Sequence, residues 1–268
     1  RKKPWRGVFR TNKYVKENKI DIYHSHFLYG VLFGLITKIP KIYTHHNIKF
    51  QVSRITFKFF DKLINNYVGI SKICSDTLST YTTKRITTII NSVNTRKFPK
   101  NTSIRKYKQN LSFLAVGRIH PQKNYYLMVD AISLLPSSIK KSIKISIAGE
   151  GPKESVEKLK TYIKNKELTE TIYLIGNQNN IPELMTKFDI FIMSSAWEGL
   201  PISLIEASIS GLPCIVTDVG GCSEVLNTCK NGIIVEPNNA QKLADAITSY
   251  FENPEKIYEH SKNGMFYS

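Results

Sequence analysis

Short apolar runs alternate with amphipathic stretches through the second half of the chain. The apolar runs are rich in β-branched residues and too short for buried helices, so they predict strands near 111–117, 144–149, 171–176, 189–195, 213–217 and 232–236. The stretches between them predict helices near 122–135, 153–165, 181–187, 201–210, 221–227 and 239–252. Such regular alternation with short loops predicts an α/β domain whose parallel sheet is covered on both faces.

The first half follows the same alternation with fewer strands. Strands are expected at 21–26, 41–46, 67–71 and 86–91, with amphipathic stretches near 28–38, 53–65 and 72–81 between them. Four strands are few for an open sheet that binds a substrate by itself. We therefore expect this amino-terminal domain to be incomplete.

Periodicity is lost between the two halves. The segment 92–109 contains Pro99, no acidic residue and six basic ones: Arg96, Lys97, Lys100, Arg105, Lys106 and Lys108. Basic, aperiodic segments of this kind are typical of linkers. The predicted organisation is a domain over 1–91, a basic linker over 92–110 and a second domain over 111–268.

The positive charge of the chain is concentrated in its first half. Residues 1–110 hold 23 Lys and Arg against 4 Asp and Glu, a net +19, whereas residues 111–268 hold 15 against 17, a net −2. A polybasic surface of this kind suits an anionic membrane, at about 1 kcal/mol per basic residue. Nucleic acid attracts the same charge, but no zinc finger, RNP pattern or KH loop supports it, so no nucleic-acid partner is expected. A lysine-rich proteome is a third explanation of the composition.

Cysteine usage and hydropathy indicate a cytoplasmic location. The four cysteines show neither C-x-x-C spacing nor the paired histidines of a zinc site, so reduced thiols are expected. The longest apolar stretch, 27–36, is about half of what a bilayer crossing requires. We expect a cytoplasmic protein, with peripheral attachment to the inner face of the plasma membrane as the extension that the basic half suggests. The chain begins at Arg1 rather than Met, so an upstream segment is expected to be missing.

Two glutamates follow the strand predicted at 189–195. Glu198 falls in the loop after the strand, and Pro201 suits the first turn of the next helix. Glu206 lies on that helix, three residues after Ser203, so both side chains share one side. Ligands of open α/β sheets bind at the carboxyl ends of the strands. A pair of glutamates is weak evidence alone, but the strand before it and the Gly-Leu-Pro turns strengthen a binding-site interpretation.

The segment Glu198-Gly-Leu-Pro-Ile-Ser-Leu-Ile-Glu206 resembles the donor-site motif of family 4 retaining glycosyltransferases, the "glycosyl transferases group 1" type with the GT-B fold. Four further segments resemble the family in the expected order, over about half the chain. They are Ala115-Val-Gly-Arg-Ile119 with Gln122-Lys-Asn124, Ile147-Ala-Gly-Glu-Gly-Pro152, Ile172-Tyr-Leu-Ile-Gly176, and Thr217-Asp-Val-Gly-Gly221 with Glu224.

The resemblance implies two Rossmann-like domains facing a cleft. In the family the amino-terminal domain opens with additional βα units, including a glycine-rich loop, and this chain has nothing in their place. Either these units were lost or the sequence is a fragment, and a fragment is favoured. The family hinge follows a segment usually read Asn-Gly-Val-Asp, here altered to Asn91-Ser-Val-Asn94.

The resemblance also implies roles in donor binding. Arg118 and Lys123, after the Gly117 turn, are expected to contact the diphosphate, because fixed cations stabilise the charge of the leaving group. The other donor-site residues carried over are Gly199 and Leu200 through backbone amides, Ser203, Glu206 at the ribose, and Gly176 with Asn177 at the base loop. Glu198 is expected near the donor sugar, as a catalytic residue. Without the family context, solvated surface cations would explain Arg118 and Lys123 equally well.

Histidines gather at two predicted strand ends in the basic half. His46 resembles the sugar-contacting histidine of the family and is the second expected catalytic residue, while His24 and His26 resemble a structural pair. A histidine metal cluster that also includes His45 is the alternative. No D-x-D pair stands at a strand end, so neither a metal nor a cofactor is expected. A dinucleotide oxidoreductase is disfavoured, because the glycine series after Gly149 is interrupted by Pro152.

Together these features predict a metal-independent, retaining glycosyltransferase. It would move a sugar from a UDP- or GDP-linked donor to a glycan or lipid-linked acceptor in surface polysaccharide synthesis. Two alternatives remain open at this point. A non-catalytic nucleotide-sugar binder would bind the donor without transfer, and a GT-B epimerase would convert free nucleotide sugar without an acceptor.

Overall fold

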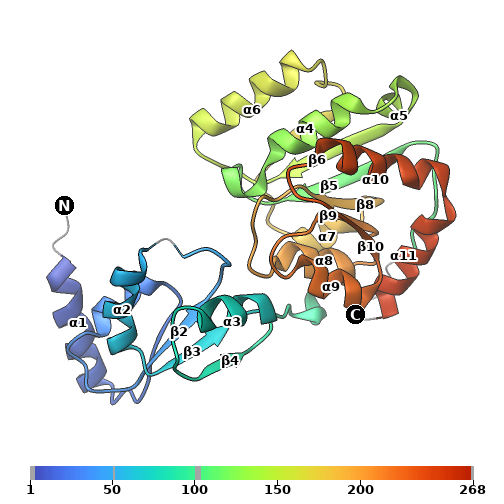
Figure 1. Cartoon of the computed structure of the whole chain (residues 1–268). Coiled ribbons are helices and arrows are strands. Elements are labelled where there is room, and N and C mark those ends of the chain that lie inside the picture. The colour runs from blue at the N-terminus through green and yellow to red at the C-terminus, as the bar shows by residue number, and fades with distance from the viewer. Residues whose placement is uncertain (1–3, 51, 100–103, 267–268) are drawn as a thin grey trace. The chain divides into compact units, whose positions relative to one another are not determined.

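The computed structural model describes residues 4–50, 52–99 and 104–266, and the chain forms two compact units (Figure 1). Unit 1 comprises residues 1–91 and unit 2 comprises residues 92–268. Each unit is built on its own parallel sheet, of four strands in unit 1 and six in unit 2. The predicted α/β class with two parallel sheets is confirmed.

Unit 1 has the strand order β1-β2-β3-β4. Its strands are β1 (Tyr23–Ser25), β2 (Lys41–His45), β3 (Asn66–Gly69) and β4 (Ile86–Thr88). Its helices are α1 (Pro4–Glu17), the 3-10 helix η1 (Leu28–Gly34), α2 (Arg54–Leu63) and α3 (Lys72–Ser79). The four predicted strands are all present, and the later helices begin at serine caps: Ser53 accepts from the backbone of Thr56, and Ser71 from that of Cys74.

Helix α1 was missed by the sequence pattern because its apolar face is narrow. Among residues 5–17, whose burial the structure describes, only Val8 and Val15 are buried, and Gly7 lowers the intrinsic helix propensity. The structure explains the glycine, since a Cβ at Gly7 would overlap the ring of Phe33 in η1. Close packing against η1 therefore stabilises a helix that local sequence favours weakly.

The core of unit 1 is largely aromatic. Tyr43 and Tyr67 pack edge to face on neighbouring strands, and Phe57 from α2 covers Tyr67. His45, at the end of β2, stacks on Phe50 with ring centroids 4.1 Å apart, and the Tyr43 hydroxyl bonds its Nδ1. Burial, followed by the charge of neighbouring His46, lowers the pKa of His45 to about 4. His45 is therefore a neutral core residue at physiological pH.

Unit 2 has the strand order β10-β9-β8-β5-β6-β7, and every pairing is parallel. Its strands are β5 (Leu111–Val116), β6 (Ile143–Ala148), β7 (Ile172–Gly176), β8 (Ile190–Met193), β9 (Cys214–Thr217) and β10 (Gly232–Val235). Its longer helices are α4 (Tyr125–Leu134), α6 (Lys153–Asn165), α8 (Ile202–Ile209), α9 (Cys222–Cys229), α10 (Ala240–Glu252) and α11 (Glu255–Phe266). The short helices are η2 (Thr95–Lys97), η3 (Pro121–Lys123), α5 (Ser137–Lys141) and α7 (Ile181–Met185).

Helices cover both faces of the unit 2 sheet, as the alternating pattern predicted (Figure 1). One core lies against α4, α6 and α10, and a second lies against α8 and α9. The strand order reverses between β5 and β8, because β6 lies on one side of β5 and β8 on the other. Such a reversal leaves a crevice at the carboxyl ends of the strands, where α/β sheets bind ligands.

The predicted linker over 92–110 is corrected, because its described residues belong to unit 2. Arg105 is 8% exposed, and its guanidinium donates to the carbonyls of Met185, Phe188 and Ser210. Lys108 pairs with Asp189 at 2.6 Å. The sequence predicts solvated basic residues here, but Arg105 and Lys108 instead bind this segment to the amino-terminal end of β8. Residues 100–103 of the predicted linker lie outside the described residues.

Candidate active site

Three strands of unit 2 end in glycines that pack against one another. Gly117 follows β5 and Gly149 follows β6, each with a positive φ, and Gly176 ends β7 at φ 67°. The Gly117 amide donates to the carbonyl of Ala148, and the Gly149 amide donates to that of Gly176. A Cβ at Gly149 would overlap the Gly117 carbonyl oxygen. Glycine is therefore required for the close approach of these loops.

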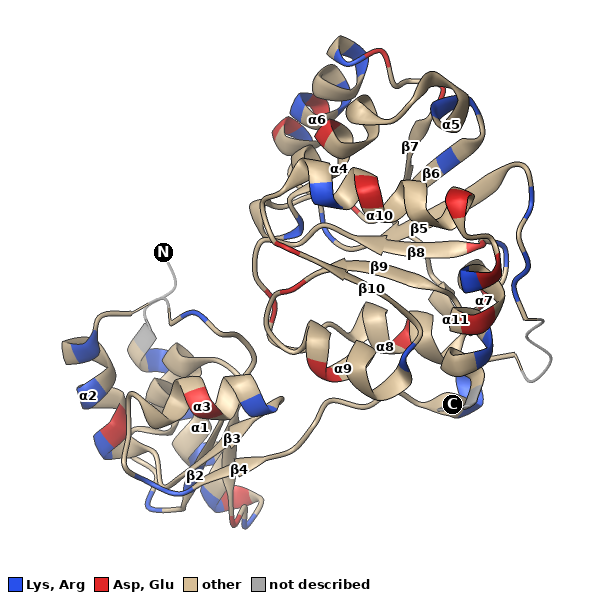
Figure 2. Cartoon of the chain, turned by 45° about the vertical axis from the view of Figure 1, so that its right-hand side comes forward, with Lys and Arg blue, Asp and Glu red and all other residues tan. Residues whose placement is uncertain are grey.

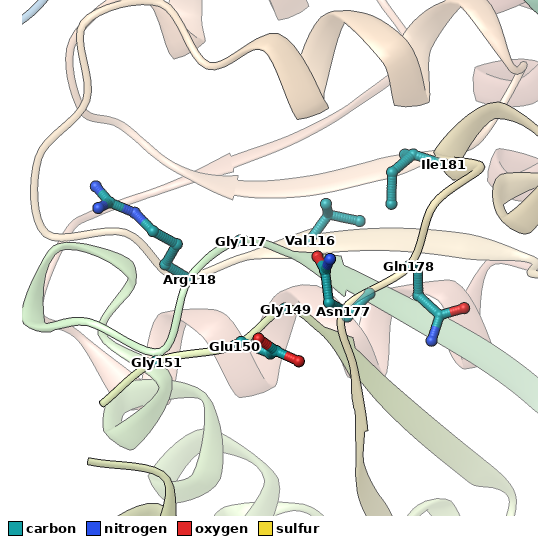
Figure 3. A pocket seen from close by; sticks show the side chains of 10 residues that line it. Val116, Gly117, Arg118, Gly149, Glu150, Gly151, Asn177, Gln178 and Ile181 are labelled. Carbon is teal, nitrogen blue, oxygen red and sulfur yellow. The ribbon is translucent and has the colours of Figure 1, made fainter. Parts of the chain in front are cut away.

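A hollow of about 530 Å³ opens at this edge of the sheet (Figure 3). Figure 3 shows Arg118 and Gln178 at opposite sides of it, with Asn177 and Glu150 between them. Arg118 is exposed, so its guanidinium is accessible to a ligand. The lining residues are Val116, Gly117, Arg118, Ala148, Gly149, Glu150, Gly151, Asn177, Gln178 and Ile181. Backbone amides and a guanidinium at the ends of parallel strands suit a phosphate group.

Lys123 lies beside the Gly117 turn. It ends the turn η3, after which Asn124 takes a left-handed conformation and α4 begins. The lysine stem occupies the space that a Cβ at Gly117 would need. Its Nζ lies 2.7 Å from Oε1 of Glu198, and the two side chains are 16% and 6% exposed. The two predicted residues, 75 positions apart, therefore form a buried ion pair.

Glu198 is held by further donors. Ser195 donates to its Oε1 at 2.8 Å, and Gln122 donates to its Oε2 at 3.1 Å. Ser194 donates to the carbonyls of Lys123 and Asn124, which fixes the η3 turn against the end of β8. A carboxylate offers about four acceptor positions, so this one has room for about one more donor.

The end of β9 and the loop after it are hydrogen-bonded to the loop that carries Glu198. Thr217 donates to the carbonyl of Ser195, and the Gly221 amide donates to the carbonyl of Gly199 at 2.7 Å. A Cβ at Gly220 would overlap the Glu198 carbonyl oxygen. The glycine pair singled out in the sequence thus allows two loops to approach closely and fixes the acid.

Helix α8 carries the second acid. It begins at Ile202, so Gly199 and Leu200 precede it rather than opening it, and Pro201 is its cap. Ser203 and Glu206 lie one turn apart on α8. Glu206 is half-buried, and burial raises its pKa, whereas the charge of Lys97 opposes that shift.

The predicted donor residues fall into two groups in the structure, one at the hollow and one at α8 and the loop before it. Gly117, Arg118 and Asn177 line the hollow, and Gly176 directly precedes Asn177. Lys123 joins this group to Glu198 through its contact with Gly117. The α8 residues and the preceding loop, which are Gly199, Leu200, Ser203 and Glu206, do not line the hollow.

His46 belongs to unit 1, at the carboxyl end of β2. Its Nε2 lies 2.8 Å from Nδ1 of His26, and His24 bonds Thr44 at 2.7 Å. Burial, followed by the charges of His26 and His24, lowers the pKa of His46. Within the described residues no group of three or more His, Cys, Asp or Glu is arranged to bind a metal, so the alternative of a histidine metal cluster is not supported.

The family model for "Glycosyl transferases group 1" matches residues 97–265. The chain belongs to this family. The matched segment is most of unit 2 and contains every predicted donor residue, so the family expected from the motifs is confirmed.

Curated relatives of this glycosyltransferase are themselves named as glycosyltransferases. A UDP-Gal:α-D-GlcNAc-diphosphoundecaprenol α-1,3-galactosyltransferase of Escherichia coli is 26% identical over 91% of the chain and 70% of its own length. A lipopolysaccharide core mannosyltransferase of Rhizobium meliloti is 29% identical over 56% of the chain and 44% of its own length. The chain thus spans between two fifths and three quarters of the length of these relatives.

Solved glycosyltransferase structures share the fold. Anabaena HepE in complex with UDP-glucose superposes with a TM-score of 0.83 at 18% identity, over 97% of this chain and 76% of that one. Sucrose-phosphate synthase of Thermosynechococcus elongatus gives a TM-score of 0.84 at 17% identity, over 97% and 71%. The expected GT-B fold of the glycosyltransferase is confirmed.

Two site residues of the glycosyltransferase escaped sequence reasoning. Ser195 ends the apolar run before Glu198, where a small polar residue reads as the close of a strand. In the sequence Gly149 is only one residue of a motif, although its lack of a side chain allows the close approach to Gly117. The available signal is local, since both are small residues within two positions of the end of a buried strand.

Proposed function

We propose that the protein transfers a glycosyl group from a nucleoside diphosphate donor held in unit 2 to a glycan or lipid-linked acceptor, with retention of configuration and without a metal ion. The observation that carries this proposal is that two cations lie at the Gly117 turn: Arg118 lines the hollow at the strand ends, and the Lys123 stem packs against Gly117. Cations fixed at this point stabilise the negative charge that grows on a departing diphosphate.

The donor is proposed to be a UDP-sugar. Names of relatives support this choice, since UDP-Gal is the donor of the galactosyltransferase from Escherichia coli and UDP-glucose is bound to HepE. The diphosphate would lie between Arg118 and the Lys123 ammonium, and the base would extend toward Asn177. A guanidinium binds two phosphate oxygens in its plane, whereas an ammonium acts as a point charge.

Glu198 is proposed to position Lys123 as well as to meet the donor sugar. An ammonium has three protons, so the bond to Glu198 leaves donors for phosphate oxygens. The remaining acceptor position of the carboxylate suits a sugar hydroxyl. Glu206 would accept from the ribose hydroxyls, and the loop amides of Gly199 and Leu200 would approach the sugar and phosphate.

Retention is proposed to follow from attack on the face that the leaving group vacates, without a protein nucleophile. His46 of unit 1 is proposed to contact a sugar of the substrate. The lipopolysaccharide core biosynthesis in the name of one relative supports a role in surface polysaccharide assembly, and the lipid diphosphate acceptor in the name of the other supports a lipid-linked acceptor.

A transfer assay tests this proposal. The whole chain is incubated with a panel of UDP- and GDP-sugars and a polyprenyl diphosphate-linked saccharide, with and without EDTA. Transfer with unchanged rate in EDTA and the donor's anomeric configuration in the product is expected. Donor binding without transfer would indicate a non-catalytic binder, and conversion of the donor without acceptor would indicate an epimerase. Either result would contradict the proposal.

The basic unit 1 is proposed to bind an anionic bilayer, such as the inner face of the plasma membrane. On α2, Ile55 is 83% exposed and Phe59 51% exposed, beside exposed Lys58 and Lys62. Figure 2 shows the basic positions of α2 in blue. Apolar residues flanked by lysines suit the surface of an anionic membrane. None of the described helices combines the length and apolar character that a bilayer crossing needs.

Co-sedimentation with phosphatidylglycerol vesicles measures this attachment. We expect binding at 0.05 M salt that is largely lost at 0.5 M, because added salt screens surface charges. Replacing Lys58 and Lys62 with Glu should weaken binding, whereas replacing Lys160 and Lys164, equally spaced and exposed on α6, should not. Salt-independent binding, or equal loss in both double variants, would count against an electrostatic contact at α2.

A further inference from the structure

Two neighbouring strand ends of unit 1 bring His26 and His46 together. β1 and β2 are parallel, with Ser25 opposite Tyr43, so β2 continues for two residues past this last pair. His26 follows β1 directly, and His46 follows β2 directly. Their rings lie 5.0 Å apart at an angle of 36°, and His26 Nδ1 is 2.8 Å from His46 Nε2.

His24 fixes this pair from the side. Its Nε2 lies 2.7 Å from the hydroxyl oxygen of Thr44, which is 4% exposed on β2. The His24 ring lies 4.5 Å from the His26 ring. The three histidine rings therefore form a row in which His24 is hydrogen-bonded to β2, His26 packs on His24, and His46 packs on His26.

A hydrogen bond between two ring nitrogens constrains protonation. One nitrogen must carry a proton and the other must offer a lone pair, so at least one ring is neutral and in a defined tautomer. The second nitrogen of His46, Nδ1, makes no hydrogen bond with any residue that the structure describes. Within the described residues, His46 is thus hydrogen-bonded through Nε2, and its Nδ1 is accessible to a ligand.

We propose that His26 is a positioning residue for His46: its Nδ1 accepts the Nε2 proton of His46, which leaves His46 Nδ1 as an acceptor for a sugar hydroxyl. This inference rests on the proposed function, in which His46 contacts a sugar of the substrate. A sugar presents hydroxyl donors, which a neutral imidazole nitrogen with a free lone pair can accept.

The charges around the pair agree with a neutral His46. Burial and the neighbouring charges of His26 and His24 lower its pKa, and burial and His26 lower that of His24. Protonating several of these rings at once would bring like charges together. At neutral pH the side chain is therefore a neutral hydrogen-bonding group rather than a cation.

The test compares His26→Ala with His26→Asn in the whole chain. The carbonyl oxygen of Asn can take the place of Nδ1 and accept from His46, whereas Ala cannot. Long-range ¹H–¹⁵N spectra of histidine-labelled protein report the tautomer of each ring. His260, which bonds Tyr250 on α10, is the internal reference, and its signals should not change.

We expect His46 to carry its proton on Nε2 in the wild type and in His26→Asn, and to populate both tautomers in His26→Ala. Turnover should fall by a factor of about 10 to 100 in His26→Ala, with little change in the affinity for UDP, and recover in His26→Asn. A proton on Nδ1, or an unchanged tautomer and turnover in His26→Ala, would overturn the inference. If the wild type turns over no donor, the proposed function fails. The tautomer of His46 would still show whether His26 accepts its Nε2 proton.

Discussion

Replacing Glu198 with glutamine is expected to reduce turnover by a factor of about 100 or more, because it removes the anion that holds Lys123 at the diphosphate position. The amide can accept through only one of its two terminal atoms. Lys123, Ser195 and Gln122 all donate to the carboxylate, so at least one donor loses its acceptor. Breaking a buried pair on one side also lowers the free energy of unfolding, by about 3 kcal/mol.

Asp189→Asn separates these two effects. Asp189 directly precedes β8, the strand that ends before the Glu198 loop. It is 5% exposed and accepts hydrogen bonds from Lys108 and Ser112. Its loss should lower stability to a similar extent without touching the donor site. Kinetics at 20 °C with thermal melts of both variants make the comparison. Equal turnover in the two variants would show that Glu198 acts only through stability.

Gly149→Ala is expected to abolish UDP binding. The residue has φ 150°, and a Cβ would overlap the backbone oxygen of Gly117, so the β5 turn that carries Arg118 must move. Backbone strain together with overpacking should cost about 4 kcal/mol of folding free energy. Calorimetric titration with UDP and chemical unfolding measure the two losses.

Gly176→Ala is the matched control. Gly176 also has a positive φ, 67°, but a Cβ there has open space around it. Left-handed backbone alone costs about 1 to 2 kcal/mol. UDP affinity should therefore change much less in Gly176→Ala than in Gly149→Ala. Equal losses of affinity would mean that loop packing at Gly149 does not shape the site.

The sheet architecture could be predicted because the strands are buried on both faces. Such strands appear as continuous β-branched runs, and every strand predicted in unit 2 is present within about two residues. The carboxyl-end location of the site followed from the same topology. Glu198 and Lys123 could each be singled out from the turn that follows its strand.

Pairings between distant residues could not be predicted. Nothing local to Lys123 indicates that its ammonium meets Glu198, since the contact depends on β5 lying beside β8. The sequence predicts a linker at Arg105 because its carbonyl partners, Met185, Phe188 and Ser210, belong to a distant part of the chain. Helix α11 was missed for a related reason, because its buried Ser261 bonds Gly211 and the Arg105 amide rather than showing an apolar face.

The most direct test is a calorimetric titration of the whole chain with UDP, beside Arg118→Ala and Lys144→Ala. Lys144 is an exposed cation at the opposite end of β6, and its loss should leave the affinity unchanged. Hydrogen bonds to charged groups contribute about 1.5 to 3 kcal/mol, so Arg118→Ala should weaken binding by about tenfold to a hundredfold. Equal affinity in the wild type and Arg118→Ala, or no binding of UDP at all, would contradict a diphosphate site at the Gly117 turn.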